Sequence, residues 1–176
     1  IRSMASHRRP DILLYINGLP LIFIELKNSN IKLRTAYDDN LINYKADIPQ
    51  LFHTNTLCVL SNGIETRIGS LSASWDHFSP WLRPDDEKEK VKRESVGKDG
   101  TSVERFLAGL CTKDKLLDYF ENFVIYYKEN QKIVAQNHQF IGVNKTFLKF
   151  LRREELDGKL GVFWHTQGSG KSFSMI

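Results

Sequence analysis

The chain has 176 residues, of which 41% are hydrophobic and 26% charged, and its formal net charge is +4 at pH 7. This composition is typical of a soluble globular protein, and the absence of any run of about 18 apolar residues argues against a membrane span. The positive charge suits a polyanionic partner but does not require one.

Two apolar runs early in the chain predict a β-hairpin. Residues 12–16 and 20–24 are almost entirely apolar and flank an Asn-Gly turn signal at residues 17–18. Apolar side chains fill both faces of these runs, so we expect a hairpin that is buried on both sides and carries charge at one end only. That end holds Asp11 and the Glu-Leu-Lys segment 25–27.

The length of the hairpin loop decides whether the two carboxylates meet. Opposed residues of an antiparallel pair share a face, and faces alternate with a period of two residues. A two-residue loop would point Asp11 and Glu25 to opposite faces, whereas a three-residue loop, residues 17–19, pairs them and brings Lys27 to the same face. The alternative is a strand end that emerges into solvent, where any charged residues would serve. Because polar groups at the end of buried strands are costly unless paired or metal-bound, we predict the three-residue loop and a divalent metal held by both carboxylates.

Beyond the hairpin, periodicity and turn signals predict a mixed sheet with flanking helices. Helices are expected at 32–46, 102–110, 113–123 and 143–153, and strands at 57–60, 64–68 and 124–127. Residues 85–94 form a charge run that is typical of a solvated loop. The order of strands and helices predicts an α/β fold, with a domain boundary near residue 130.

A second chemical signal lies near the end of the chain. Residues 160–164 predict a buried strand that runs into a glycine-rich loop at residues 165–172. Backbone N–H groups of such a loop curl around phosphates, and the helix that follows points its positive end at them. In this pattern Lys171 reaches the β- and γ-phosphates, and the Ser172 hydroxyl ligates Mg²⁺. His165 stands where the full pattern has its first glycine.

The cysteines and histidines predict no zinc site. Cys58 and Cys111 both lie in apolar stretches, which indicates buried, reduced thiols in a cytoplasmic protein. Neither has a metal-ligating partner at short spacing, and the five histidines form no H-x-x-x-H or Cys/His array. The chain reads as an internal piece of a longer protein, because its last residues stop just inside a predicted helix.

Together, the two motifs resemble the R (restriction and motor) subunit of type I restriction enzymes. Residues 9–28 look like its PD-(D/E)xK nuclease segment, and residues 44–52 and 60–63 look like the rest of that domain. Residues 161–172 are similar to motif I of its superfamily-two helicase motor, a family in which the first loop glycine is normally replaced. The resemblance covers nearly the whole chain.

The resemblance implies two domains and a function. Residues 1–130 are expected to be a restriction-endonuclease-like mixed sheet with flanking helices, truncated at its start. Residues 131–176 are expected to be the first strand and phosphate loop of a RecA-like helicase or translocase domain, truncated after motif I. The implied activity is Mg²⁺-dependent hydrolysis of phosphodiester bonds in double-stranded DNA, coupled to ATP-driven translocation. The implied partners are DNA and the methyltransferase and specificity subunits, in the cytoplasm and away from any membrane.

The resemblance also carries over further site residues. The family has a Q-x-x-x-Y motif on the helix after E-x-K, and residues 40–44 match it with asparagine in the first position; residues i and i+4 share a helix face. The family places a glutamine ahead of motif I to contact adenine, and Gln139 fits. The candidate catalytic residues are Asp11, Glu25, Lys27, Asn40 and Tyr44. The candidate nucleotide-binding residues are Gln139, Thr166, Gln167, Gly168, Ser169, Gly170, Lys171 and Ser172.

Two alternatives stay open from the sequence. One is an ATP-driven helicase or translocase whose nuclease-like domain is inactive and only binds DNA, and Asn40 in place of glutamine favours it. The other is a non-catalytic piece that only docks to partners. In each case the 176-residue piece alone is expected not to hydrolyse ATP, because the Walker B acid and the second-lobe arginine that hydrolysis needs are missing from it.

Overall fold

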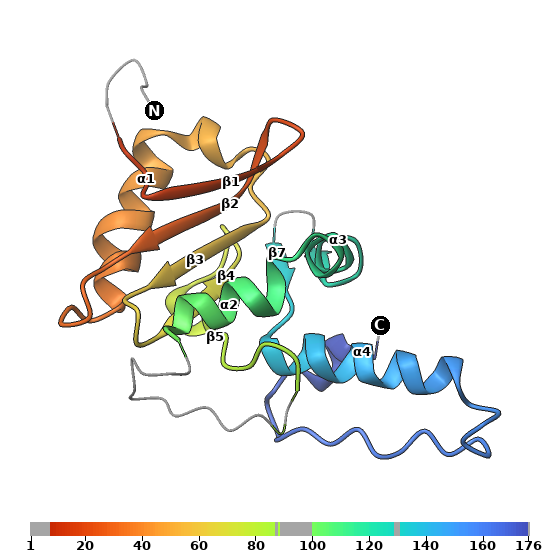
Figure 1. Ribbon diagram of the computed structural model, residues 1–176. Coiled ribbons are helices and arrows are strands. Elements are labelled where there is room, and N and C mark those ends of the chain that lie inside the picture. The colour runs from red at the N-terminus through yellow and green to blue at the C-terminus, as the bar shows by residue number, and fades with distance from the viewer. Residues whose placement is uncertain (1–7, 87, 89–99, 129–130, 176) are drawn as a thin grey trace.

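A five-stranded mixed sheet organises the first part of the molecule, with the strand order β1-β2-β3-β4-β5 (Figure 1). The computed structural model describes residues 8–86, 88, 100–128 and 131–175, so most of the charge run at 85–94 lies outside the described residues. The strands are β1 (Ile12–Ile16), β2 (Leu19–Leu26), β3 (Leu57–Ser61), β4 (Thr66–Gly69) and β5 (Ser79–Pro80). Strands β2 and β3 are parallel, and the other neighbours are antiparallel. The predicted mixed α/β class is confirmed.

Helices cover both faces of this sheet (Figure 1). One face packs against the π-helical turn η1 (Ala36–Leu41), α1 (Ile42–Asp47) and the 3₁₀ turn η2 (Pro49–Phe52). The other face packs against α2 (Ser102–Leu110), α3 (Lys113–Asn122) and the first turn of α4 (Asn137–Leu151). Phe23 belongs to the first cluster and its neighbours Ile22 and Ile24 to the second, because successive side chains of a strand point to opposite faces.

Trp81 is the centre of the second cluster. Its side chain is 1% exposed, and its ring lies 5.9 Å from Phe106, 6.2 Å from Tyr119 and 5.9 Å from Phe140. Aromatic pairs at these separations add to the stabilisation that burial alone provides. Because Phe140 is on α4, this cluster joins the first turn of α4 to the five-stranded sheet.

Strand pairing crosses the predicted domain boundary near residue 130. Strands β6 (Val124–Tyr127) and β7 (Gln131–Val134) pair with each other as a separate two-stranded sheet. Just after it, the Asn137 side chain accepts hydrogen bonds from the main-chain N–H groups of Leu82 and Arg83 and donates one to the Arg83 carbonyl. The residues on the two sides of the predicted boundary therefore share one core.

The predicted strand at 160–164 does not form. These residues follow α4 as an irregular segment, and Val162 and Trp164 are 91% and 76% exposed. A strand needs a partner strand, and residues 160–164 pair with none of the described strands. The glycine-rich loop then enters a single 3₁₀ turn, η4 (Lys171–Ser174), instead of an α-helix. Over the described ranges, no helix has both the length and the apolar character to cross a bilayer.

Candidate active site

The turn of the β1–β2 hairpin has two residues, and the predicted three-residue loop is wrong. Ile16 pairs with Leu19, so that only residues 17 and 18 form the loop. Asn17 has φ +50° and Gly18 has φ +79°, the positive values that a tight Asn-Gly hairpin turn requires. The turn therefore follows the Asn-Gly signal. The one extra residue that Asp11 and Glu25 need in order to share a face lies elsewhere in the hairpin.

A bulge in β2 supplies this extra residue. The pairing shifts between Tyr15 and Leu14, which leaves Leu21 as an extra residue on β2. Beyond the bulge Ile12 pairs with Ile24, and the same register continued by one residue sets Asp11 opposite Glu25. Bulges are common beside active sites, where they change the direction of a side chain.

Burial on both sides holds for β2 but not for β1. Residues 22–25 of β2 are buried, whereas β1 is the edge strand of the sheet and exposes 38% of Ile12 and 55% of Tyr15. The charged end of the hairpin therefore combines a buried carboxylate on β2 with a more accessible one just before β1.

Glu25 is the buried carboxylate, with 3% of its surface exposed. Its Oε1 accepts a hydrogen bond from Nζ of Lys27 at 3.1 Å, while its buried Oε2 has no hydrogen-bond partner within the described part of the chain. Burial raises the pKa of Glu25; the hydrogen bond from Lys27 opposes this rise and the nearby charge of Asp11 adds to it. The site therefore holds a carboxylate that lacks a full set of partners.

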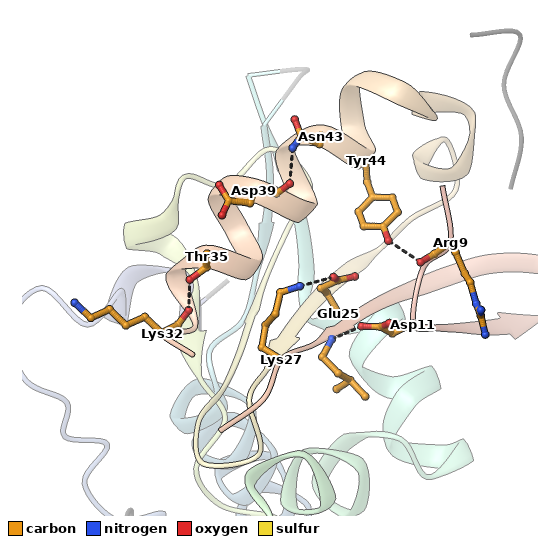
Figure 2. A network of polar contacts seen from close by, with 10 residues as sticks. Arg9, Asp11, Glu25, Lys27, Lys32, Thr35, Asp39, Asn43 and Tyr44 are labelled. Atoms are coloured by element: carbon orange, nitrogen blue, oxygen red, sulfur yellow. Dashed lines mark hydrogen bonds and ion pairs between the residues drawn. The ribbon is translucent and has the colours of Figure 1, made fainter. Parts of the chain in front are cut away.

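Asp11 lies across from it on an exposed segment (Figure 2). One carboxylate oxygen accepts the main-chain N–H of Leu26 at 2.8 Å, a bond that holds Asp11 beside the end of β2. The N–H of Lys27 donates to the Ser61 carbonyl at 2.7 Å, which fastens the end of β2 to β3. The structure thus brings Asp11, Glu25 and Lys27 together at one end of the sheet.

Tyr44 reaches the same end from α1. Its ring packs edge-on against Phe23 with 5.2 Å between centroids, and its hydroxyl donates to the Arg9 carbonyl at 2.7 Å (Figure 2). Burial, followed by the negative charges of Glu25 and Asp11, raises the pKa of Tyr44 to about 12. The hydroxyl is therefore a neutral hydrogen-bond donor throughout the physiological pH range.

Asn40 is placed differently from Tyr44. It lies half-buried within η1, and among the described residues no hydrogen bond joins its amide to Asp11, Glu25 or Lys27. A π-helical turn bonds residue i to i+5, so the α-helical spacing that aligned Asn40 with Tyr44 does not apply through residue 41.

Arg8 and Asp47 form a contact that the sequence patterns did not indicate. The Nε and Nη2 atoms of Arg8 both lie 2.5 Å from Oδ2 of Asp47, one turn after Tyr44 on α1. The available signal was the pair of arginines directly before Pro10 and Asp11. Neither periodicity nor spacing indicated which acid would bind them.

The glycine-rich loop contacts α4 through Gln139. This side chain is 5% exposed; its Nε2 donates to the Gly170 carbonyl at 2.9 Å, and its Oε1 accepts the Gln136 N–H at 2.8 Å. Gly168 and Gly170 have φ values of +79° and +76°, which favour glycine. A cavity of about 440 Å³ lies beside this contact, between the β6–β7 hairpin, α4 and the loop.

The remaining candidate nucleotide-binding residues lie on the surface of this loop. Nζ of Lys171 donates to the His165 carbonyl at 3.0 Å, so the lysine folds back over its own loop. The Ser169 hydroxyl donates to the Thr166 carbonyl at 2.7 Å. The exposed members are Thr166, Gln167, Gly168, Lys171 and Ser172.

Comparison with known proteins relates both ends of the chain to restriction enzymes and ATPases. Residues 2–77 match the family model described as type I restriction enzyme R protein N terminus, and residues 138–176 match SWI2/SNF2 ATPase. The HindI endonuclease subunit, a type I restriction enzyme subunit of Haemophilus influenzae, is 39% identical over 100% of this chain. A putative type I restriction enzyme MjaIXP endonuclease subunit of Methanocaldococcus jannaschii is 34% identical over 96% of this chain.

The chain spans 17% and 18% of the lengths of these two relatives. A type I restriction enzyme endonuclease subunit of Staphylococcus aureus is 25% identical over 94% of the chain. The match to the R protein model contains Asp11, Glu25, Lys27, Asn40 and Tyr44, and the ATPase match contains Gln139 and the whole glycine-rich loop. On these grounds, the chain belongs to the family of type I restriction enzyme R (endonuclease) subunits.

Proposed function

We propose that this chain carries the nuclease centre of a type I restriction enzyme, in which Asp11, Glu25 and Lys27 act in Mg²⁺-dependent hydrolysis of double-stranded DNA. The observation that carries the proposal is the buried Oε2 of Glu25, which has no partner among the described residues and lies close to a second carboxylate. Burial of a carboxylate oxygen without a partner is unfavourable. A cation held by Glu25 and Asp11 would remove this penalty.

The donor set fits Mg²⁺. This ion is usually held by one or two carboxylates and keeps waters or phosphate oxygens in its other positions. Across the described residues, no group of three His, Cys, Asp or Glu side chains gathers, so two carboxylates would be the whole side-chain contribution at this end of the sheet. When bound, Mg²⁺ polarises the phosphate and lowers the pKa of a coordinated water.

Lys27 has two tasks in this proposal. Its ammonium group is 3.1 Å from Oε1 of Glu25, so that it neutralises part of the carboxylate charge while no DNA is bound. A lysine in this place also orients the attacking water or stabilises the negative charge that develops on the phosphate in the transition state. Its main-chain bond to Ser61 holds it in place for both tasks.

The glycine-rich loop is proposed to bind ATP and Mg²⁺ for translocation along DNA. The positive φ angles of Gly168 and Gly170 support this, because they let backbone N–H groups turn toward phosphates. Lys171 would leave the His165 carbonyl to bind the β- and γ-phosphates, and Ser172 would ligate the metal. The Gln139 side chain accepts the Gln136 N–H and donates to the Ser169 and Gly170 carbonyls, so it would exchange its contacts with the loop for contacts with adenine when ATP binds.

The partners of the whole protein follow from family membership and are likewise proposals. We infer that the full-length subunit works in the cytoplasm with double-stranded DNA, a methyltransferase subunit and a specificity subunit. The relatives are named as endonuclease subunits of type I restriction enzymes, which supports this assignment.

Asp11→Asn tests the nuclease proposal in the full-length R subunit assembled with its partner subunits. This change keeps the shape of the side chain and removes the negative charge that a metal requires. Plasmid cleavage should disappear while ATP hydrolysis stays near the wild-type rate. Cleavage at the wild-type rate would overturn the proposal. A wild-type complex that hydrolyses ATP but never cuts DNA would instead support a translocase with an inactive nuclease domain.

A further inference from the structure

Two basic side chains near the carboxylate end of the β1–β2 hairpin have no acidic partner among the described residues. Arg9 and Lys32 are both exposed, and within the described part of the chain neither side chain forms a hydrogen bond or an ion pair. Three neighbouring basic side chains are paired with carboxylates: Arg8 with Asp47, Lys27 with Glu25, and Arg34 with Asp38. Arg9 and Lys32 are therefore available to an anion from outside the chain.

The main chain of Arg9 is held in place. Its carbonyl accepts the Tyr44 hydroxyl at 2.7 Å, and Pro10 restricts the backbone that follows. One residue further on, the Asp11 carboxylate accepts the Leu26 N–H at 2.8 Å. The Arg9 side chain therefore projects from a defined position two residues before Asp11.

The main chain of Lys32 is held equally well. After the end of β2, the chain makes a turn in which the Ile31 N–H donates to the Asn28 carbonyl at 2.9 Å. The Asn62 side chain donates to the Ile31 carbonyl at 3.0 Å, which ties this turn to the end of β3. The Lys32 carbonyl then accepts the Thr35 hydroxyl at 2.6 Å. Lys32 thus has a fixed main chain and an unpaired ammonium group, as Arg9 has a fixed main chain and an unpaired guanidinium group.

These two cations lie on either side of the carboxylates. Figure 2 shows Asp11 and Glu25 between Arg9 and Lys32, with Lys27 on the Lys32 side. The carboxylates alone would repel a phosphate, but a divalent cation held by both would offset their charge. DNA carries a phosphate at every nucleotide, so a strand with one phosphate at the metal places further phosphates on both sides of it.

We propose that Arg9 and Lys32 bind the DNA phosphates on either side of the phosphate that is cut, and thereby hold the strand across the carboxylates. This inference rests on the proposed function and names residues that would hold its substrate. Contacts to phosphates fix the position of a protein on DNA and carry no sequence information. The two residues would therefore position any DNA sequence at the metal, and they take no part in breaking the bond.

The chain offers a matched control for the loss of one positive charge. Lys113 is exposed and, among the described residues, has no hydrogen-bonded or ion-pair partner. It begins α3, which packs on the other face of the sheet from η1 and α1. The variants Arg9→Lys and Lys32→Arg keep the charge at each position, and they separate its effect from that of side-chain size.

The test measures binding of a short linear duplex of arbitrary sequence to the full-length R subunit, with Ca²⁺ in place of Mg²⁺ and without nucleotide. Affinity is recorded over a range of salt concentrations, because each phosphate contact contributes about 0.9 to the slope of log affinity against log salt. We expect Arg9→Gln and Lys32→Gln each to reduce this slope by about 0.9, and the double variant to reduce it by about twice as much. Lys113→Gln, Arg9→Lys and Lys32→Arg should keep the wild-type slope.

Three outcomes separate this inference from the proposed function. A wild-type slope in the double variant would overturn the inference, even if Asp11→Asn abolishes cleavage. An equal reduction in Lys113→Gln would also overturn it, because the effect would then be one of net charge. A wild-type cleavage rate in Asp11→Asn would contradict the proposed function itself. Thermal unfolding checks that each variant folds, and Arg9→Met and Lys32→Met remove the same charges if a glutamine variant does not fold.

Discussion

The carboxylate end of the β1–β2 hairpin and the glycine-rich loop each carry a recognisable motif, but only the first lies within a packed sheet. Glu25 is 3% exposed and sits on a strand paired on both sides, whereas Val162, on the predicted strand before the loop, is 91% exposed. The loop is held to α4 chiefly through Gln139 and His138. A motif therefore acquires its geometry from the strands beside it, and the motif residues alone do not supply it.

The clearest way to separate the two regions is to remove one lysine from each. Lys27→Ala should abolish DNA cleavage in the assembled enzyme and leave ATP hydrolysis near normal, because Lys27 acts beside the two carboxylates. Lys171→Ala should abolish ATP hydrolysis and, with it, cleavage that depends on translocation. Plasmid cleavage and phosphate release measure the two activities. Loss of both activities in Lys27→Ala would indicate that the two regions are not separable.

Substitution of two tryptophans compares the packing of the sheet with that of the segment before the glycine-rich loop. Trp81 is 1% exposed and Trp164 is 76% exposed. Trp81→Ala should lower the free energy of unfolding of the 176-residue chain by about 3–5 kcal/mol, because it leaves a cavity among aromatic rings. Trp164→Ala should change it by less than about 0.5 kcal/mol. Denaturant titrations provide the measurement, and similar losses in both variants would mean that residues 160–164 are packed in solution.

The pH dependence of stability tests the electrostatics of the carboxylate end. Because the pKa of Glu25 is raised, the metal-free folded chain holds this proton more tightly than the unfolded chain does. The stability that the protonated form contributes is present below the ordinary glutamate pKa and is lost as the pH rises through the raised value. Glu25→Gln carries no titrating carboxyl group and should not show that loss. Its free energy of unfolding relative to that of the wild type should therefore increase as the pH rises across this window. Thermal unfolding in chelator measures this, and a difference independent of pH would contradict the raised pKa.

Substitution of two glycines that have the same backbone conformation should give the smallest change in the free energy of unfolding. Gly18 and Gly168 both have φ +79°, and a Cβ would meet no atom within 4 Å at either. Gly18→Ala should destabilise the chain by about 1 kcal/mol, because the hairpin turn must keep this conformation. Gly168→Ala should have less effect on unfolding, because an exposed loop can change conformation without disturbing the core. A larger loss for Gly168→Ala would show that the loop is more tightly held than its exposure indicates.

The sequence predicted the mixed α/β class and the hairpin because both depend on local signals. The same face for Asp11 and Glu25 was predicted from chemistry, but through a wrong loop length. The two side chains share a face because of a bulge at Leu21. Pro20 directly before it is compatible with a bulge, but it is equally compatible with the start of a strand, where it was predicted.

The remaining differences involve contacts between residues far apart in sequence. The ion pair between Arg8 and Asp47 joins positions 39 residues apart, which periodicity cannot indicate. Residues 160–164 have the composition of a buried strand, yet pairing also requires a partner edge. The π-helical turn at 36–41 carries no distinct signal, and for that reason the helix around Asn40 was predicted as regular.

A crystal structure of the full-length R subunit soaked with Mn²⁺ would show whether Asp11 and Glu25 hold a divalent cation. Anomalous scattering locates the ion without reference to any activity. We predict one peak at the end of β2, within about 2.3 Å of a carboxylate oxygen of both Asp11 and Glu25. A fully occupied Mn²⁺ site elsewhere, with no peak between these two side chains, would contradict it.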